Sequence, residues 1–408
     1  MIITGILLPG NKSVIKNALA VFSYQKEKFM RYQFYSIILI FIVFLTNCSA
    51  QKKSVDVLTF QQNYGKISET AKLSEARASH TATRLADGKV IIIGGMERNG
   101  VFFDNAEIFN PQTNNFTKAK GKMSIERSGH TGTLLPNGKI LIVGGWSSRD
   151  LPEMSAEIYD PKTETFSSVE NPHHRLSGHI AILLDNGKVL IAGGSDGKEG
   201  LGDVELFNPQ NNTFTLIGKM QSARTGAAAT KLTDGRILLT GGELNRGKIL
   251  SSAEIFDPKT NSFTATKAMN AVRYKHDSIR LSDGRVLVFG GSDNRDWNGQ
   301  YKSAEIFDPK TNEFTPTNDM NLARFKIEGT SVLLKDGKVF IGGGGTGAEI
   351  FDPKTNAFTK TAGEFGAPLH YASVTLLDDE RALIVGGYGN GTRETGPVST
   401  NRAWIFKL

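Results

Sequence analysis

The sequence predicts an all-β fold, a β-propeller of seven blades, from three observations. A pair of glycines follows an apolar run seven times along the chain, at spacings of 50, 49, 48, 49, 53 and 43 residues. A turn dipeptide, in most copies Asp-Gly or Asn-Gly, lies six residues before each pair. A motif that reads A-E-I-F-D-P or a close variant follows each of the first six pairs. Four short strands per repeat of this length are typical of a propeller blade.

Each unit opens with a strand and a tight hairpin. Asn-Gly and Asp-Gly between apolar runs favour a two-residue hairpin, because both residues tolerate a positive φ. The seventh copy has Asp379-Glu380 at this turn, which predicts a different hairpin there. The glycine pairs that end the second strands are Gly94-Gly95, Gly144-Gly145, Gly193-Gly194, Gly241-Gly242, Gly290-Gly291, Gly343-Gly344 and Gly386-Gly387.

The third and fourth strands follow a loop of variable length. The third carries the A-E-I-F-D-P motif, as at 106–111 and 253–258, and the last copy is A-W-I-F-K-L at 403–408, where the chain ends. A polar turn then leads to a fourth strand that starts at a phenylalanine, such as Phe116 or Phe263. Each unit therefore predicts one antiparallel four-stranded sheet.

These features together resemble the kelch repeat of the galactose oxidase central-domain-like superfamily. The resemblance covers residues 67–408 and implies seven sheets around an axis, with the first strand of each nearest the axis. The seventh copy lacks a fourth strand. Residues 67–77 align with 214–224, the fourth strand of another copy and the segment after it. We therefore expect the N-terminal strand to pair with residues 403–408, because an unpaired blade edge would leave free backbone groups.

The N-terminus predicts an export signal and a lipid anchor. Basic residues precede a short apolar run at 37–45, as in a secretory signal. The segment Leu45-Thr46-Asn47-Cys48 resembles the bacterial lipobox, which implies lipidation of Cys48; Asn47 departs from the usual small residue, and an ordinary signal peptide is the alternative. We expect residues 1–47 to be the signal, with 1–29 a spurious extension if Met30 is the true start, and 48–66 to be a tether.

This N-terminal signal implies secretion across the inner membrane of a bacterium. It also implies a lipoprotein of the cell envelope that lies on the outer membrane or faces the periplasm. The net charge is +7, of which +4 lies before Cys48. The remaining +3 is too small to indicate a nucleic-acid partner. A single cysteine excludes an intrachain disulfide and a thiolate-based zinc site.

Two faces are expected. The face with the Asp-Gly and Asp-Pro turns is uniform and basic, which fits solvated strand ends or contact with anionic lipid. The loops after the glycine pairs and the connectors between blades vary and share the other face, where we expect a ligand to bind. Its candidate ligand-binding residues are Asp293, Arg295, Trp297, Tyr301, Trp146, Arg149, Tyr388 and Arg393. The alternative is that these aromatic residues only pack on neighbouring loops.

Arginine and histidine recur in the connectors, three residues apart. A positively charged funnel for an acidic ligand would use Arg77, Arg127, Arg224 and Arg273. The alternative, which we prefer, pairs them with the repeated glutamates of the third strands. The histidines at 80, 130, 179 and 276 repeat too regularly to favour a metal site.

The pattern favours a monomeric binding module for a protein or carbohydrate ligand, without a cofactor. Galactose oxidases use copper and a cysteine cross-linked to tyrosine, which Cys48 cannot supply from before the fold. The alternative function is a sugar-active enzyme resembling the sialic acid mutarotases, which would need acid–base groups near the axis.

Overall fold

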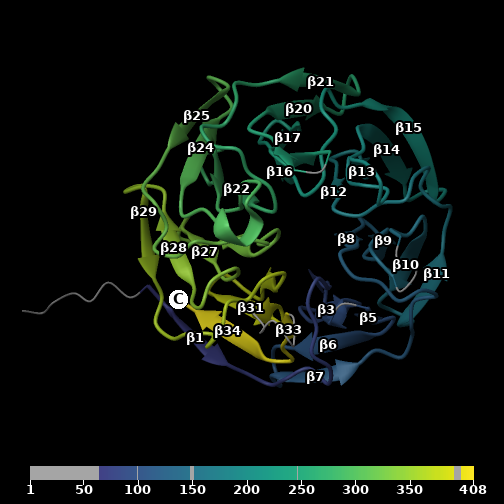
Figure 1. The fold of residues 1–408 in the computed structure, drawn as a ribbon. Helices are drawn as coiled ribbons and strands as arrows, with labels where there is room; N and C mark the ends of the chain where they lie inside the picture. Colours follow the sequence, from purple (N-terminus) through teal and green to yellow (C-terminus); the bar gives the residue numbers. More distant parts are fainter. Residues whose placement is uncertain (1–63, 99, 148–150, 246, 390–396) are drawn as a thin grey trace, which may run out of the picture. The chain divides into compact units, whose positions relative to one another are not determined.

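A computed structural model describes residues 64–408 except 99, 148–150, 246 and 390–396. These residues form seven four-stranded antiparallel sheets around a central channel (Figure 1). The seven-bladed kelch-type propeller predicted from the sequence is confirmed. No α-helix occurs in this part of the chain, and no helix here is long and apolar enough to cross a membrane.

The strands of each blade, given from the channel outward, have the following bounds. Blade one contains β2 (Thr81–Arg84), β3 (Val90–Ile93), β6 (Ala106–Asn110) and β7 (Asn115–Lys118), and blade two contains β8 (Thr131–Leu134), β9 (Ile140–Val143), β10 (Ala156–Asp160) and β11 (Thr165–Ser168). Blade three contains β12 (Ile180–Leu183), β13 (Val189–Ala192), β14 (Asp203–Asn208) and β15 (Thr213–Lys219). Blade four contains β16 (Ala228–Lys231), β17 (Ile237–Thr240), β20 (Ala253–Asp257) and β21 (Ser262–Ala265). Blade five contains β22 (Asp277–Arg280), β23 (Val286–Phe289), β24 (Ala304–Asp308) and β25 (Glu313–Pro316). Blade six contains β26 (Ser331–Leu333), β27 (Val339–Ile341), β28 (Glu349–Asp352) and β29 (Ala357–Lys360). Blade seven contains β30 (Ser373–Leu376), β31 (Arg381–Val385), β34 (Ala403–Lys407) and β1 (Lys66–Glu69).

The glycine pair at the end of each second strand lets adjacent blades approach closely. Gly94 and Gly95 have φ values of +62° and +98°, which L side chains rarely adopt. A Cβ atom on Gly94 would lie 2.7 Å from the Arg127 carbonyl oxygen of the next blade's connector, and one on Gly95 would lie 2.7 Å from the Ala78 carbonyl oxygen. The repeat needs glycine here both for its backbone conformation and for space.

The core lies between and within the blades. Second strands such as β3 and β23 are buried at every residue, because both of their faces pack against neighbouring sheets. The aromatic residue of the third-strand motif stacks on the phenylalanine that opens the fourth strand. Phe109 and Phe116 have ring centroids 4.9 Å apart, and Tyr159 and Phe166 are 4.8 Å apart. The repeated aromatics therefore tie the outer strand to each blade.

The seventh sheet is built from both ends of the fold. β1 pairs with β34 in antiparallel register, with Lys66 opposite Lys407 and Glu69 opposite Trp404. In Figure 1, β1 lies beside β34 at the outer edge of this sheet. The Arg402 guanidinium donates to the Glu69 carboxylate at 2.8 Å, which adds a side-chain link between the two ends. The innermost strands β30 and β2 also contact each other, so the circle of inner strands is continuous.

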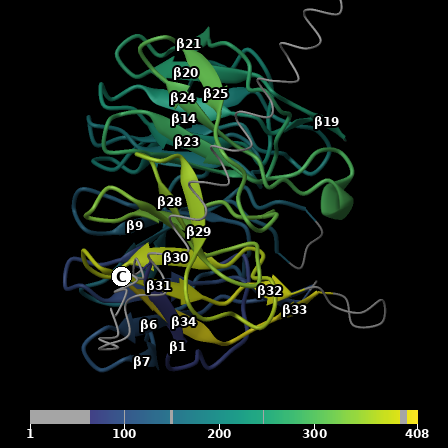
Figure 2. The ribbon, with the colours of Figure 1, turned by 90° about the vertical axis from the view of Figure 1, so that its left-hand side faces the viewer.

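The loops after the glycine pairs and the connectors between blades lie on one face, as the strand directions predict. Isolated backbone bridges join each connector to such a loop, for example between Ala78 and Met96 and between Tyr274 and Ser292. This loop face carries three hairpins, β4–β5 (Met96–Arg98, Val101–Phe102), β18–β19 (Glu243–Leu244, Lys248–Ile249) and β32–β33 (Tyr388–Gly389, Val398–Ser399), and one 3-10 turn, η1 (Asp296–Asn298). Figure 2 shows β19, β32 and β33 projecting on this side.

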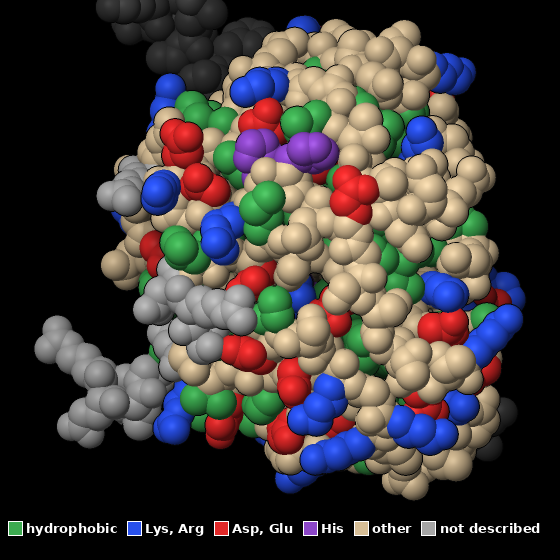
Figure 3. Space-filling view, turned by 90° about the vertical axis from the view of Figure 1, so that its right-hand side faces the viewer, with side chains coloured by type: hydrophobic (Ala, Val, Ile, Leu, Met, Phe, Trp, Pro, Cys, Tyr) green, Lys and Arg blue, Asp and Glu red, His purple; other side chains and the backbone are tan. Residues whose placement is uncertain are grey.

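The outer rim carries mixed charge. In Figure 3, acidic and basic side chains alternate over the rim, and two neighbouring histidines lie at its surface. His173 and His174, which are adjacent in the sequence, pair with Glu205 at 2.8 Å and Asp203 at 3.7 Å. No strongly charged region of one sign is visible on this side.

Candidate functional site

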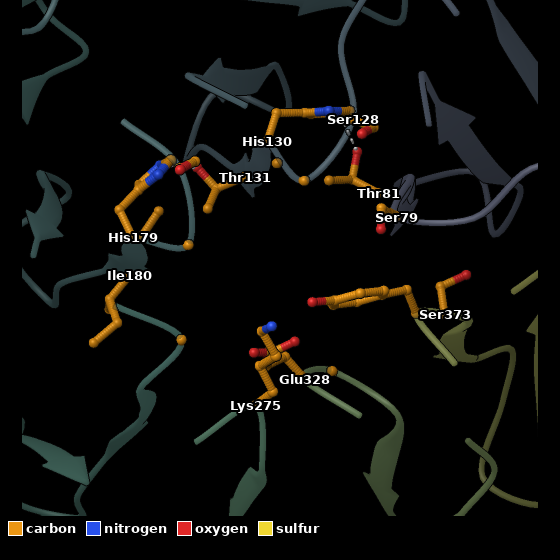
Figure 4. Close-up of a pocket in the computed structure, with 18 of the residues that line it drawn as sticks. Ser79, Thr81, Ser128, His130, Thr131, His179, Ile180, Lys275, Glu328 and Ser373 are labelled. Atoms are coloured by element: carbon orange, nitrogen blue, oxygen red, sulfur yellow. Dashed lines mark hydrogen bonds between the residues drawn. The ribbon is translucent and has the colours of Figure 1, made fainter. Parts of the chain in front are cut away.

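The channel opens on the loop face into a cavity of about 1060 Å³. Its wall consists of the inner strands and the connectors that lead into them. Figure 4 shows Lys275 and Glu328 close together at one wall, with Ser79 and Ser128 across the channel. We call this region the channel mouth.

Each connector places one residue of the channel mouth in the left-handed backbone region. These seven ring positions precede the inner strands by two to five residues and have φ between +51° and +62°; they are Ser79, Gly129, Gly178, Gly226, Lys275, Lys326 and Tyr371. Backbone hydrogen bonds of 2.8–3.0 Å link six of the seven neighbouring pairs, from the N–H of one ring position to the carbonyl of the preceding one; their donors are Ser79, Gly129, Gly226, Lys275, Lys326 and Tyr371. The bond from Ser79 to Tyr371 joins blades one and seven.

The ring positions divide the mouth into two unlike halves. Blades two to four use glycine, which adopts a positive φ without steric cost. Blades five to seven use Lys275, Lys326 and Tyr371, although this conformation costs a non-glycine residue about 1–2 kcal/mol. Three bulky side chains held in a strained conformation at equivalent places indicate that the side chains themselves are needed.

Lys326 is enclosed by aromatic rings from three consecutive blades. Its Nζ lies 4.0 Å from the ring centroid of Trp297 and 5.1 Å from that of Phe325. The rings of Tyr371 and Tyr388 lie 5.6 and 5.5 Å away, and Nζ donates a hydrogen bond of 2.9 Å to the Tyr388 hydroxyl. Ring faces attract a cation, so this cage holds the ammonium without a carboxylate partner.

Lys275 and Glu328 face the cavity in front of this cage. The Lys275 Nζ lies 4.8 Å from the Tyr274 ring centroid and 5.7 Å from that of Phe325. Neither Lys275 nor Lys326 forms an ion pair with a carboxylate of the described residues. Tyr274 is fixed by donating its hydroxyl proton to Asp296 of η1 at 2.5 Å. The charged wall is therefore supported by residues of three blades.

The electrostatics of this wall depend on pH near neutrality. Burial and, to a lesser degree, the nearby charge of Lys275 lower the pKa of Lys326 to about 8. Burial raises the pKa of Glu328 to about 7, and burial raises the pKa of Asp277 on the neighbouring wall to about 6. The net charge of the mouth therefore becomes less positive as pH rises from 6 to 9.

The repeated histidines are structural. Each buried imidazole shares a hydrogen bond with a hydroxyl group, such as His80 with Ser373 at 2.9 Å and His276 with Thr240 at 2.8 Å. Burial lowers the pKa of His80 and His276 to about 3 and that of His179 to about 4, so they are neutral at pH 7. No group of three metal-ligating side chains occurs among the described residues.

The connector arginines are not ligand-binding residues, and this part of the prediction is corrected. All are fully buried and lie outside the cavity lining, because each forms an ion pair with the glutamate of its blade's third strand. The pairs are Arg77–Glu107 (3.0 Å), Arg127–Glu157 (2.9 Å), Arg224–Glu254 (2.5 Å) and Arg273–Glu305 (3.0 Å). The connector arginines thus pair with the third-strand glutamates, as the alternative expectation stated. A fifth pair of the same kind, Arg324–Glu349 (2.9 Å), was not predicted from the sequence.

The predicted loop residues divide between the mouth and its surroundings. Trp297 and Tyr388 belong to the cage around Lys326, and Trp146 lines the cavity on the opposite side. Asp293 and Arg295 instead pair with each other at 2.7 Å on an exposed loop. Tyr301 stacks on the Arg273 guanidinium, whose carbon lies 5.2 Å from its ring centroid. Arg149 and Arg393, like Cys48, lie outside the described residues.

Sequence reasoning missed the residues at the centre of the mouth. The sequence prediction did not include four residues of this wall, namely Lys275, Lys326, Tyr371 and Glu328. These residues interrupt the repeat, whereas the predicted arginines and histidines recur in it. A signal was available in the same connectors. Aligning R-S-G-H at 127–130 with its counterparts gives serine or glycine at the third position in four blades and lysine, lysine and tyrosine in the others.

Comparisons with known proteins agree with this architecture. The family model described as the KLHDC2/KLHL20/DRC7 kelch-repeats domain matches residues 46–242, and the kelch motif model matches 224–270 and 280–321. No curated protein matches the chain. A solved structure of a fungal alcohol oxidase of the AA5 family in complex with copper shares 18% sequence identity, with a TM-score of 0.67 over 85% of this chain and 76% of that one.

The likeness to the oxidase concerns the fold. The described residues lack a metal-ligating cluster, and the one cysteine of the sequence, Cys48, precedes the blades. These residues do not fit a copper centre with a cysteine–tyrosine cross-link. The repeat pattern, the seven sheets and the matching models agree with one another. The chain therefore belongs to the kelch-repeat proteins.

Proposed function

We propose that the protein is a binding module that recognises a protein or carbohydrate ligand at the channel mouth. The observation that carries this proposal is the clustering of side chains that break the repeat. Lys275, Lys326 and Tyr371 occupy three consecutive ring positions beside a cavity of about 1060 Å³. A purely structural ring would use glycine throughout, as blades two to four do.

The chemistry of the mouth suits a ligand with polar and apolar parts. Exposed aromatic residues and cations are typical anchors of recognition surfaces. Trp146, which lines the cavity, and Trp297, which packs on Lys326, are 37% and 36% exposed, and Lys275 presents a cation to the cavity. Hydroxyl and glycine residues such as Ser79 and Gly129 line the other wall and leave room for the body of the ligand.

We further propose that the propeller is held at the bacterial cell envelope by a lipid on Cys48. The support is the sequence pattern alone: a basic segment, an apolar run at 37–45, and the single cysteine directly after it. Residues 49–63 would then serve as the tether. Labelling cells with a radioactive or alkyne palmitate tests this, because Cys48→Ser should abolish incorporation of the label, whereas incorporation that persists in this variant contradicts the proposal.

A glycan array combined with a peptide array, probed with residues 49–408, tests the binding function. Lys275→Gly is the informative variant, because glycine suits the ring geometry and the fold is preserved. Lys198→Gln, an exposed lysine on the blade-three loop of the same face, is the matched control. We expect a hit that Lys275→Gly weakens at least tenfold and Lys198→Gln leaves unchanged. Hits that ignore Lys275 would place the binding surface elsewhere.

An acid–base enzyme acting on a sugar is the second candidate. The favouring observation is that Glu328, with a pKa of about 7, lines the cavity and can exchange a proton near neutral pH. Incubating array hits with the protein and following them by NMR separates the two functions. Turnover that is lost in Glu328→Gln supports the enzyme, and binding without turnover supports the module.

A further inference from the structure

We propose that the channel mouth binds a small organic acid with a flat or apolar body, whose carboxylate lies against Lys275. This inference deepens the proposed function and rests on it only for the location of the site. It names the class of ligand, which neither the fold nor the family determines.

The first step is the positive charge that Lys275 and Lys326 give to the blade-five and blade-six wall. Lys275 and Lys326 both contact the ring of Phe325, at 5.7 and 5.1 Å from its centroid. Two ammonium groups on one small ring repel each other, and neither has a carboxylate partner among the described residues. The carboxyl that acts on both ammonium groups is Glu328, whose pKa burial raises to about 7, so a bound anion would relieve the repulsion most when Glu328 is protonated.

The second step is access. Lys275 lines the cavity, whereas Lys326 is 8% exposed and lies behind the rings of its cage. A ligand carboxylate therefore contacts Lys275 directly, and Lys326 contributes through its field. Hydrogen-bonded ion pairs of this kind are stronger than in water because the mouth is partly shielded from solvent.

The third step is the body of the ligand. Tyr274, whose ring contacts Lys275, and Tyr371, which follows Lys326 in the ring of left-handed positions, both line the cavity, so aromatic surface borders the point where the carboxylate docks. The glycine ring positions of the opposite half, such as Gly226, keep that side open. A flat acid can lie across the tyrosines with its far end over the glycines.

The fourth step is the charge balance of the mouth. As pH rises through about 6 to 8, Asp277 and then Glu328 ionise, and Lys326 begins to lose its charge. The local field therefore turns from attracting an anion to repelling it. The other charged or titratable groups that face this wall are Lys275, Asp296, Glu243, Tyr274, Tyr371, Tyr388 and His370. The pKa values of Tyr274, Tyr371 and Tyr388 are raised by burial, so these hydroxyls remain protonated throughout.

Isothermal titration of residues 49–408 with benzoate, and with benzamide as the neutral isostere, tests the proposal at constant ionic strength. We expect benzoate to bind at pH 6 at least tenfold more tightly than benzamide, and to weaken at least tenfold at pH 9. Inorganic phosphate is titrated in parallel, because tighter binding of phosphate than of benzoate would show that the site prefers a phosphate group and would overturn the assignment to an organic acid.

Three variants separate charge from structure. Lys275→Gly should weaken benzoate at least tenfold at pH 6, and Lys198→Gln should leave it unchanged. Glu328→Gln should strengthen benzoate at pH 9 and flatten the pH dependence, which a merely structural role would not do. Equal binding of benzoate and benzamide, or of wild type and Lys275→Gly, overturns the proposal. A hit on the arrays that still depends on Lys275 would leave the binding function standing in that case.

Discussion

The ion pair of Arg127 with Glu157 illustrates what one residue does in every repeat. The arginine is fully buried and also donates to the Gly144 carbonyl at 2.9 Å, while the glutamate accepts from the Ser124 backbone N–H at 3.0 Å. The arginine thus hydrogen-bonds a backbone carbonyl at the end of a second strand, and the glutamate hydrogen-bonds a backbone N–H of the connector. The pair stabilises the junction between neighbouring blades rather than a ligand.

Removing one partner of this pair should be strongly destabilising. Glu157→Ala leaves a buried guanidinium without its counter-charge, and we expect a loss of about 3–5 kcal/mol in the free energy of unfolding. Urea denaturation at pH 7.5 measures this loss. The matched control is Asp379→Ala, which removes the exposed pair with Lys335 (3.1 Å) and should cost less than about 1 kcal/mol. Similar small losses in both variants would contradict the structural role of Glu157.

The buried histidines predict sensitivity to acid. Each imidazole has a pKa of about 6.5 in the unfolded chain and a lowered one in the folded chain, about 4 for His179. The unfolded chain therefore takes up protons that the folded chain refuses as pH falls from 6.5 to about 4. Stability is intact above pH 6.5 and falls below it by about 1.4 kcal/mol per histidine and pH unit. The raised pKa of Asp277 works in the opposite direction below pH 6.

Replacing one of these histidines should remove one proton from this linkage. His179→Ala places at this position the residue that Ala227 and Ala372 provide in other blades. We expect it to be less stable than wild type at pH 7.5, but with a pH slope between 6.5 and 5 reduced by about one proton. Urea denaturation at four pH values gives the slope. An unchanged slope would mean that His179 is protonated in the folded protein.

At the scale of elements, the connectors show what the sequence predicted and what it could not. Glycine pairs are demanded by local backbone geometry and repeat in every blade, and Asp-Gly or Asn-Gly turns repeat in the first six; together they predicted all seven sheets. The cage around Lys326 joins Trp297, Tyr371 and Tyr388, which lie 29 to 62 residues away in the chain. Such a cluster depends on how adjacent blades are arranged, so no local sequence pattern predicts it.

The left-handed ring predicts how its positions respond to substitution. Gly129→Ala meets no atom within 4 Å, so its cost is that of the backbone alone, about 1–2 kcal/mol. Lys275→Gly relieves the same strain and loses the contacts of the ammonium with the Tyr274 and Phe325 rings and its attraction to Glu328, so we expect the free energy of unfolding to stay within about 1 kcal/mol of wild type. Thermal and urea denaturation check both. A Lys275→Gly variant that unfolds would show that this side chain holds the blades together.

At the scale of the whole molecule, function depends on closure of the ring. The cage of Lys326 is completed by Tyr371 and Tyr388 of blade seven, the sheet that contains both ends of the fold. β34 lies in the middle of this sheet, between β31 and β1, and buries Trp404 and Phe406. A change at either end of the fold should therefore alter the positions of the side chains at the channel mouth.

Removal of residues 403–408 tests this closure most directly. The deletion takes away two large buried aromatic side chains, each worth about 3–5 kcal/mol, and leaves β1 and β31 without their shared partner. Circular dichroism followed during heating compares residues 49–402 with residues 49–408. We predict that the shortened chain shows no cooperative melting transition at temperatures where the longer chain is folded. A shortened chain that melts cooperatively at the same temperature would contradict the claim that the two ends hold the seven blades in one ring.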